Sequence, residues 1–170
     1  ALQSLHAMPW GPDLRQLQVD HTAAHYWRLI HQHFAADWQP LQDELQAALA
    51  APPGAERCVC HMDPNPNNWR QSPSGWKLLD WEYAAIGHPY WDLANFVLMG
   101  ELPASSHQRW LELHRIDPAS LVWRRAWLQM RYLNELWYGA QRMRTAQALG
   151  NSLAVLVAAA RDLLRDEAGV

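Results

Sequence analysis

The sequence predicts a mostly helical protein of the α+β class with a small β hairpin in its middle. Apolar residues recur at helical spacing in the first 50 residues and again from Pro89 onward. Strand-like runs with turn residues between them occur in residues 57–79. The chain has 170 residues, 49% of them hydrophobic and 18% charged. We therefore expect a sizeable core and a single domain over residues 1–170.

The first helices are predicted from two sets of apolar residues. One set lies at helical spacing and the other repeats every four residues: Tyr26, Trp27, Leu29, Ile30 and Phe34, then Leu41, Leu45 and Leu49. Proline and glycine in residues 9–12 break the pattern early, and Pro52–Gly54 ends it.

A short strand and a hairpin are predicted for the middle of the chain. Residues 57–60 have strand character, since both cysteines and Val59 form an apolar run. Residues 69–71 and 76–79 flank a turn at 72–75 that is rich in serine, proline and glycine. The second strand of this hairpin leads directly into Asp80.

Helices are predicted again after the hairpin. Pro89 suits a first helical position and Gly100 suits a helix exit. A longer helical stripe runs from Pro118 to Gly139, and Asn151–Ser152 are expected to cap a final helix. The residues expected to face inward on that last helix are Leu153, Leu156, Val157, Ala160, Leu163 and Leu164.

Charge and composition argue against several classes of function. A net charge of −3 with dispersed basic residues disfavours a nucleic-acid partner. No run approaches the roughly 18 apolar residues of a membrane span, so no membrane partner is expected. Nothing at the start of the sequence resembles a secretory signal. The two cysteines, Cys58 and Cys60, suit reduced core thiols, which favours a cytoplasmic location.

The segment 61–68 carries the most distinctive chemistry. It contains the pattern H-x-D-x-x-x-x-N in His61, Asp63 and Asn68, which is the spacing of a protein-kinase-type catalytic loop. In phosphoryl transfer an Asp accepts the proton of the attacking hydroxyl, while an Asn and a second Asp hold magnesium against the phosphates. Asp63, Asn68 and Asp80 fit these three roles in order. The alternative, a simple polar turn, explains neither His61 nor Asp80.

Two other groups of potential metal ligands are expected to be structural. His21 and His25 lie four apart on a predicted helix, and a solvated helix face is the favoured interpretation. Cys58 and Cys60 should point to one side of a strand and His61 to the other, which disfavours a metal shared by these three. His61 is instead expected to pack under the catalytic loop and hydrogen-bond its backbone.

The tryptophan-rich helix is expected to belong to the core. Trp123, Trp127 and Trp137 share one helical stripe. Tyr132 and Tyr138 lie off its centre and are equally compatible with exposure. An aromatic cage for a quaternary ammonium stays open, without assigned residues.

Three segments resemble the C-terminal lobe of the aminoglycoside phosphotransferase and choline kinase superfamily. These are residues 61–68, 78–84 and 91–95. The D-W-E-Y-A run from Asp80 and the W-D-L-A-N run from Trp91 are most similar to choline, ethanolamine and thiamine kinases of bacterial type. The resemblance implies a protein-kinase-like C-terminal lobe. It also implies ATP-dependent phosphorylation of a small hydroxylated molecule.

The resemblance also implies roles for individual residues. Asp63 would be the catalytic base, and Asn68 and Asp80 would bind Mg²⁺ and, through it, ATP, with the metal-binding segment at 78–83. Asp92 would brace the catalytic loop through backbone hydrogen bonds. Glu82 would either attract a cationic substrate group or form an ion pair with an arginine, and both interpretations stay open.

The N-terminal nucleotide lobe of this family is expected to be absent from the chain. No glycine-rich loop precedes His61, and the single lysine, Lys77, lies in the hairpin. The chain alone is therefore expected to be weak or inactive as a kinase. Two alternatives remain: an aminoglycoside kinase, or a non-catalytic kinase-like remnant that acts as a binding domain.

Overall fold

Contacts between residues divide the chain into two units in the computed structural model, which describes residues 2–100 and 102–169. The first unit contains Ala1–Leu17 and Pro53–Trp127, and the second contains Gln18–Pro52 and Leu128–Val170. The catalytic loop at 61–68 and the segment 78–83 both lie in the first unit. The division is based on contacts and does not test whether either unit folds alone. The single domain over residues 1–170 therefore stays a prediction.

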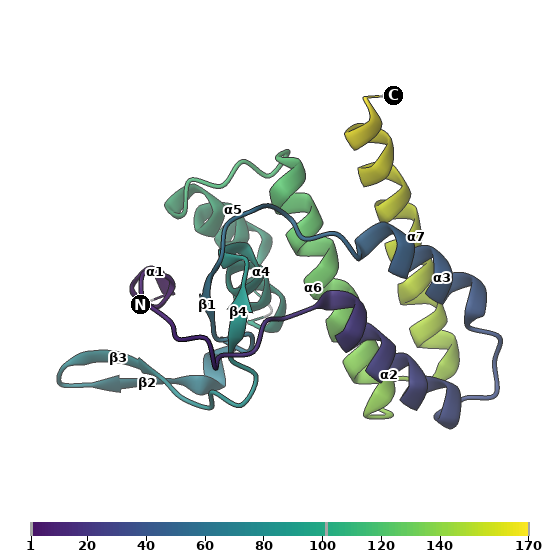
Figure 1. Cartoon of the computed structure of the whole chain (residues 1–170), viewed down its shortest axis with the longest axis horizontal. Coiled ribbons are helices and arrows are strands. Elements are labelled where there is room, and N and C mark those ends of the chain that lie inside the picture. The colour runs from purple at the N-terminus through teal and green to yellow at the C-terminus, as the bar shows by residue number, and fades with distance from the viewer. Residues whose placement is uncertain (1, 101, 170) are drawn as a thin grey trace. The chain divides into compact units, whose positions relative to one another are not determined.

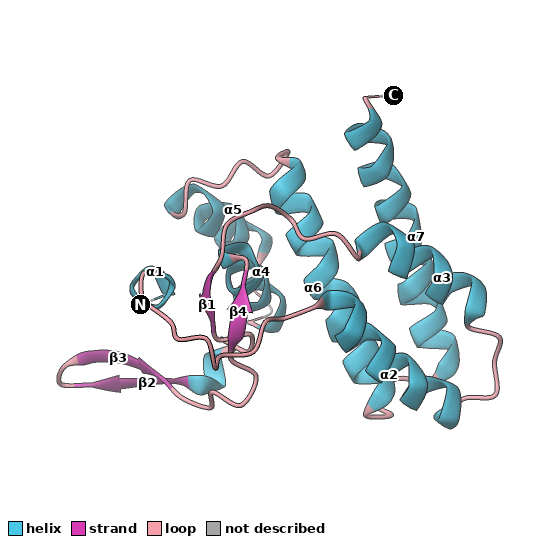
Figure 2. Ribbon diagram, viewed as in Figure 1, coloured by secondary structure: helices cyan, strands magenta, loops and turns pink. Residues whose placement is uncertain are grey.

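The first unit contains two small antiparallel sheets, one buried and one that projects as a hairpin (Figures 1 and 2). Strand β1 (Cys58–Cys60) pairs with β4 (Ala85–Gly87), and every residue of both strands is buried. Strand β2 (Trp69–Ser72) pairs with β3 (Gly75–Leu78) in a largely exposed hairpin. Gly75 has a φ of 107°, which only glycine adopts at little cost, so it closes the turn. The predicted hairpin is confirmed.

Three helices complete most of the first unit. Helices α1 (Leu2–His6) and α4 (Pro89–Met99) both contact β1, and α5 (Ala104–Leu113) follows α4. As predicted, α4 has proline at its first position and ends at Gly100. Six of its residues are buried, and they include two polar side chains that belong to the candidate site: Trp91, Asp92, Leu93, Ala94, Asn95 and Val97.

A histidine caps α4. The Nδ1 atom of His88 accepts a hydrogen bond from the backbone N–H of Tyr90 (3.2 Å), and the side chain is buried. Burial, assisted by the positive charges of Arg57 and His6, lowers the pKa of His88 from 6.5 to about 4. The unfolded chain therefore binds this proton near pH 6.5 and the folded chain only near pH 4.

This pKa shift predicts an acid-sensitive fold. The neutral His88 contributes stability above about pH 6.5, and this contribution is lost as the pH falls toward 4. We expect His88→Asn, which keeps an oxygen acceptor at the cap, to be less dependent on pH in this window. The measurement is the free energy of unfolding in urea at several pH values. Equal slopes for the two proteins would contradict the prediction.

In the described part of the second unit, all the regular elements are helices, joined by short loops. It contains α2 (Val19–His33), α3 (Gln39–Leu49), the later part of α6 (Leu121–Ala140) and α7 (Ala146–Ala168). Helix α3 contacts both α2 and α7 (Figure 1). Leucines from α3 and α7 form a large part of the core of this unit: Leu45, Leu49, Leu149, Leu153, Leu156 and Leu163.

Three side chains with polar groups are hydrogen-bonded within this second core. The indole N–H of Trp27 donates to the hydroxyl oxygen of Tyr132 (2.7 Å), and both side chains are buried. The side-chain amide of Gln129 donates to the carbonyl oxygens of Leu49 and Ala51 (2.8 and 2.7 Å) at the end of α3. Tyr132 is thus a core residue, because its hydroxyl has a buried partner.

Several predicted boundaries and exposures need correction. Helix α6 begins at Leu121 and not near Pro118. Helix α7 begins at Ala146, where the hydroxyl of Thr145 accepts from the N–H of Ala148 (3.2 Å), so Asn151–Ser152 lie inside the helix. Leu164 is 42% exposed, whereas the other residues expected to face inward on this helix are buried or nearly so.

Other expectations about exposure agree with the structure. His21 and His25 are exposed on α2. For the three tryptophans predicted to lie in the core, the agreement is partial: Trp123 is buried on α6, and Trp127 and Trp137 are half-buried. Among the described residues, no helix combines the length and the apolar character that a bilayer span requires.

Candidate active site

A buried carboxylate on α4 anchors the start of the catalytic loop. The two oxygens of Asp92 accept the backbone N–H groups of His61 (2.9 Å) and Met62 (2.8 Å). The side-chain amide of Asn95, one helical turn further on, donates to the Met62 carbonyl oxygen (2.7 Å). Met62 has a φ of 69°, a conformation that costs energy in residues other than glycine. These bonds hold that conformation just before Asp63.

The buried ring of His61 connects the loop with the segment 78–83. Its Nδ1 atom accepts the backbone N–H of Asp63 (3.3 Å), so Nε2 carries the proton and donates to the Leu79 carbonyl oxygen (2.9 Å). The N–H of Leu79 in turn donates to the carbonyl oxygen of Asn68 (2.8 Å). Both ends of the loop therefore hold Leu79, the residue before Asp80.

Two asparagine side chains position the carboxylate of Asp63. Asn65 Nδ2 donates to Oδ1 (2.8 Å), and Asn68 Nδ2 donates to Oδ2 (2.9 Å) and to the Asp63 carbonyl oxygen (2.9 Å). Each carboxylate oxygen has a second lone pair, so Asp63 can still accept a proton from a bound hydroxyl. Because the NH₂ group of Asn68 faces Asp63, its Oδ1 atom remains for another partner.

Asp80 and Glu82 follow as exposed carboxylates. Asp80 has a φ of 64°, a second left-handed residue beside the loop. Neither carboxylate has a hydrogen bond or ion pair with the part of the chain that the structure describes. The backbone that follows is held by the guanidinium of Arg15, which donates to the carbonyl oxygens of Tyr83 (2.6 Å) and Ala84 (3.2 Å).

The structure thus brings five of the sequence-predicted residues into one network. Hydrogen bonds join Asp92, His61, Asp63 and Asn68, and Leu79 connects them to Asp80. Glu82 lies in the same segment but outside the network. Asn65, Asn95 and Arg15 had no role predicted from the sequence. Only Asn95 has a local signal, since it lies three residues after Asp92 on the same side of a helix.

Asn68 and Asp80 carry oxygen atoms of the kind that a magnesium ion prefers. Mg²⁺ prefers oxygen ligands, and it usually takes one or two from carboxylates. The Oδ1 atom of Asn68 and the carboxylate of Asp80 are such donors, and neither is occupied by a hydrogen bond among the residues described. These two side chains are therefore suitable ligands.

The fold and this network define the helical, C-terminal lobe of a protein-kinase-like fold. A family model described as "Phosphotransferase enzyme family" matches residues 1–127. The chain therefore belongs to this family, that of the aminoglycoside phosphotransferases and choline kinases. A comparison with curated proteins found no match.

Several solved structures share the fold. LicA in complex with AMP has a TM-score of 0.70 and 22% identity, over 95% of this chain and 60% of that one. The choline kinase LicA from Streptococcus pneumoniae has a TM-score of 0.64 at 22% identity, with the same coverages of 95% and 60%. A choline/ethanolamine kinase family protein from Mesorhizobium loti has a TM-score of 0.61 at 16% identity, with coverages of 96% and 59%. The chain thus spans about 60% of the length of these proteins, and the predicted fold class is confirmed.

Proposed function

We propose that this chain is the catalytic lobe of a small-molecule kinase that uses ATP and Mg²⁺. The acceptor would be a hydroxyl of a molecule that resembles choline, ethanolamine or thiamine. The observation that carries the proposal is the Asp63 carboxylate, which Asn65 and Asn68 hold in place while Leu79 joins the loop to Asp80. The membership of the phosphotransferase family and the fold shared with choline kinases support it.

The proposed reaction assigns one task to each of three side chains. The acceptor oxygen forms a bond to the γ-phosphorus of ATP, the bond to the bridging oxygen breaks, and ADP leaves with that electron pair. The hydroxyl proton passes to a carboxylate oxygen of Asp63. Asn68 and Asp80 would hold Mg²⁺, which neutralises phosphate charge when bound. The protein contributes mainly by positioning these groups.

The surroundings of Glu82 favour an acceptor with a single positive charge. Glu82 is exposed and has no ion pair among the described residues, so an ion pair with an arginine finds no support there. Trp81 and Tyr83 on either side of it are 43% and 39% exposed. A carboxylate with exposed aromatic residues next to it in the sequence suits a lone ammonium or quaternary ammonium group. An aminoglycoside carries several positive charges and would require more carboxylates.

The nucleotide requires more protein than these residues supply. The sequence has no glycine-rich loop ahead of His61 and no strand lysine in that part. We therefore expect full activity only where an N-terminal lobe completes the ATP site. The expected compartment is the cytoplasm, which holds ATP and keeps thiols such as Cys58 and Cys60 reduced.

The test is phosphorylation of a panel of acceptors, followed by mass spectrometry. Choline, ethanolamine, thiamine and an aminoglycoside are each incubated with ATP, with Mg²⁺ or with EDTA. Both this chain and the natural-length polypeptide are assayed. We expect a magnesium-dependent phosphorylated product from one of the first three acceptors, formed mainly by the longer polypeptide. A product from the aminoglycoside alone would contradict the proposed substrate class. If neither protein makes any product or binds ATP with Mg²⁺, the binding-domain alternative is favoured.

A further inference from the structure

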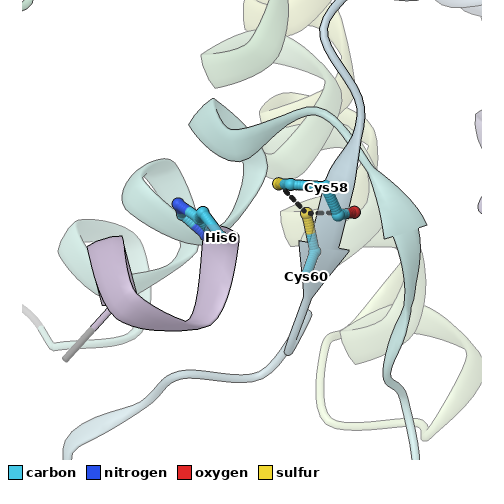
Figure 3. Close-up of side chains that lie close together, drawn as sticks. All are labelled: His6, Cys58 and Cys60. Atoms are coloured by element: carbon cyan, nitrogen blue, oxygen red, sulfur yellow. Dashed lines mark hydrogen bonds between the residues drawn. The ribbon is translucent and has the colours of Figure 1, made fainter. Parts of the chain in front are cut away.

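A second cluster of potential metal ligands lies next to the catalytic loop. His6 on α1 and Cys58 and Cys60 on β1 each offer one ligand atom, and these atoms all lie within 4.8 Å of one another (Figure 3). No other group of three or more His, Cys, Asp or Glu side chains in residues 2–100 and 102–169 meets this criterion. None of the three belongs to the proposed transfer reaction, so the cluster requires a separate explanation.

The two thiols have a separation that suits a shared metal ion. Cys58 and Cys60 alternate with Val59 along β1, so their side chains leave the strand on the same face. Their sulfur atoms are 3.6 Å apart, and both cysteines are free. Two thiolates bound at about 2.3 Å to a tetrahedral Zn²⁺ would lie about 3.8 Å apart. The sulfur atoms would need to separate only slightly.

His6 completes the set with a ring nitrogen that lies within the same 4.8 Å. Its Nε2 atom lies 3.0 Å from Oδ2 of Asp92. While that hydrogen bond is kept, Nδ1 is the atom left for a metal. A carboxylate that accepts the second ring N–H is the usual partner of a metal-bound histidine, because it fixes both the tautomer and the ring orientation. The His6 side chain is 13% exposed, so an ion can approach from its side.

The protons of the thiols set the conditions for binding. The hydrogen bond between the two thiols, together with burial, raises the pKa of Cys60, and the same hydrogen bond lowers the pKa of Cys58. A divalent ion replaces one proton on each sulfur, and both protons pass to solvent. Cys60 would also give up a weak contact with the His88 carbonyl oxygen (3.4 Å). Binding should therefore strengthen as the pH rises.

We propose that His6, Cys58 and Cys60 form a binding site for a thiophilic divalent cation, with Zn²⁺ as the natural ion. The ion would join α1 to the strand that leads into the catalytic loop. The site has two thiolates and one imidazole, and it is chemically distinct from the oxygen ligands of Asn68 and Asp80. Mg²⁺, which prefers oxygen, is excluded from it.

The first experiment uses Co²⁺ as a spectroscopic probe of the reduced, metal-free protein. One equivalent should produce thiolate-to-cobalt charge-transfer absorption and the visible bands of a tetrahedral site. One equivalent of Zn²⁺ should remove both, and an excess of Mg²⁺ should not. Competition with a chromophoric chelator then gives the zinc affinity, which should fall as the pH is lowered. A wild-type protein without these bands, or with no zinc affinity, overturns the proposal.

Variants identify the ligands. Cys58→Ser and Cys60→Ser should each remove most of the charge-transfer absorption and weaken zinc binding by at least about 100-fold. His6→Gln keeps both thiols, so it tests the ligand assignment if the serine variants do not fold. It should weaken zinc binding at least about tenfold. His25→Gln, on the exposed face of α2, is the matched control and should bind as the wild type does. Unchanged bands and affinity in the folded variants would overturn the proposal.

Discussion

Asp63→Asn should abolish phosphoryl transfer almost completely while the protein remains folded. An amide has nearly the size of a carboxylate, but it cannot accept the proton of an attacking hydroxyl at neutral pH. Loss of a general base typically lowers the rate about 100- to 10,000-fold. We expect this loss in kcat, with a smaller change in KM for the acceptor. The measurement is steady-state phosphorylation of the acceptor identified in the panel, with the natural-length polypeptide.

The effect of this substitution on stability should be small. Asp63 is half-buried, and an asparagine there can accept from only one of the two amides that now donate to its carboxylate, those of Asn65 and Asn68. The cost should be about 1 kcal/mol, the usual size of one such hydrogen bond. Asp13→Asn is the matched control, because Asp13 is exposed and has no hydrogen bond to any described residue. Near-normal kcat in Asp63→Asn would refute the assignment of the base.

Asp92→Asn should lower both stability and activity. Asp92 is fully buried, and its two oxygens face three nitrogen atoms: the backbone N–H groups of His61 and Met62, and Nε2 of His6. An amide has one oxygen, so its NH₂ group must face at least one of these donors. Breaking a buried, charge-assisted network of this kind costs about 2–4 kcal/mol. Urea denaturation of the variant and of wild type measures the loss.

The loss of activity in Asp92→Asn should have a different origin from that in Asp63→Asn. Asp92 does not touch the reacting atoms; it holds the backbone before Asp63, and a shift of about 1 Å at a reacting group can cost about 100-fold in rate. His6→Gln removes only the third of the three donors and should destabilise the protein less. A variant at Asp92 as stable as wild type would show that the loop does not depend on this carboxylate.

Local sequence patterns were sufficient for most of the secondary structure. Proline and glycine at Pro89 and Gly100 marked both ends of α4, and the hairpin followed from alternation around a turn. The local sequence did not define the first residue of α7, because Thr145 and Asn151 are both good N-cap residues. The structure shows that the helix begins at the earlier one, where Thr145 caps it and Leu149 is buried in the first turns.

Pairings between distant segments had no signal in the sequence. Strand β4 has three residues, too few to show the alternation of apolar and polar residues that predicts a strand. It is a strand because Cys58 and Cys60 pair with Gly87 and Ala85. The burial of Tyr132 likewise depends on Trp27, which comes from a different helix. In both cases the partner decides the structure of the segment, and the partner is far away in the chain.

The sequence by itself determined the identity and order of the chemical groups: Asp63 and Asn68 within one short loop, and Asp80 at the end of the following hairpin. The separation of these residues along the chain is fixed by the order of the amino acids, so it can be read from the sequence directly. The resemblance already implied that Asp92 braces the loop, and the tertiary structure supplied its partners, the N–H groups of His61 and Met62. The tertiary structure alone decided that His61 binds Leu79 and that His6 meets the two thiols. These contacts join residues separated along the chain, and their distances depend on how helices and strands pack and not on their own sequence.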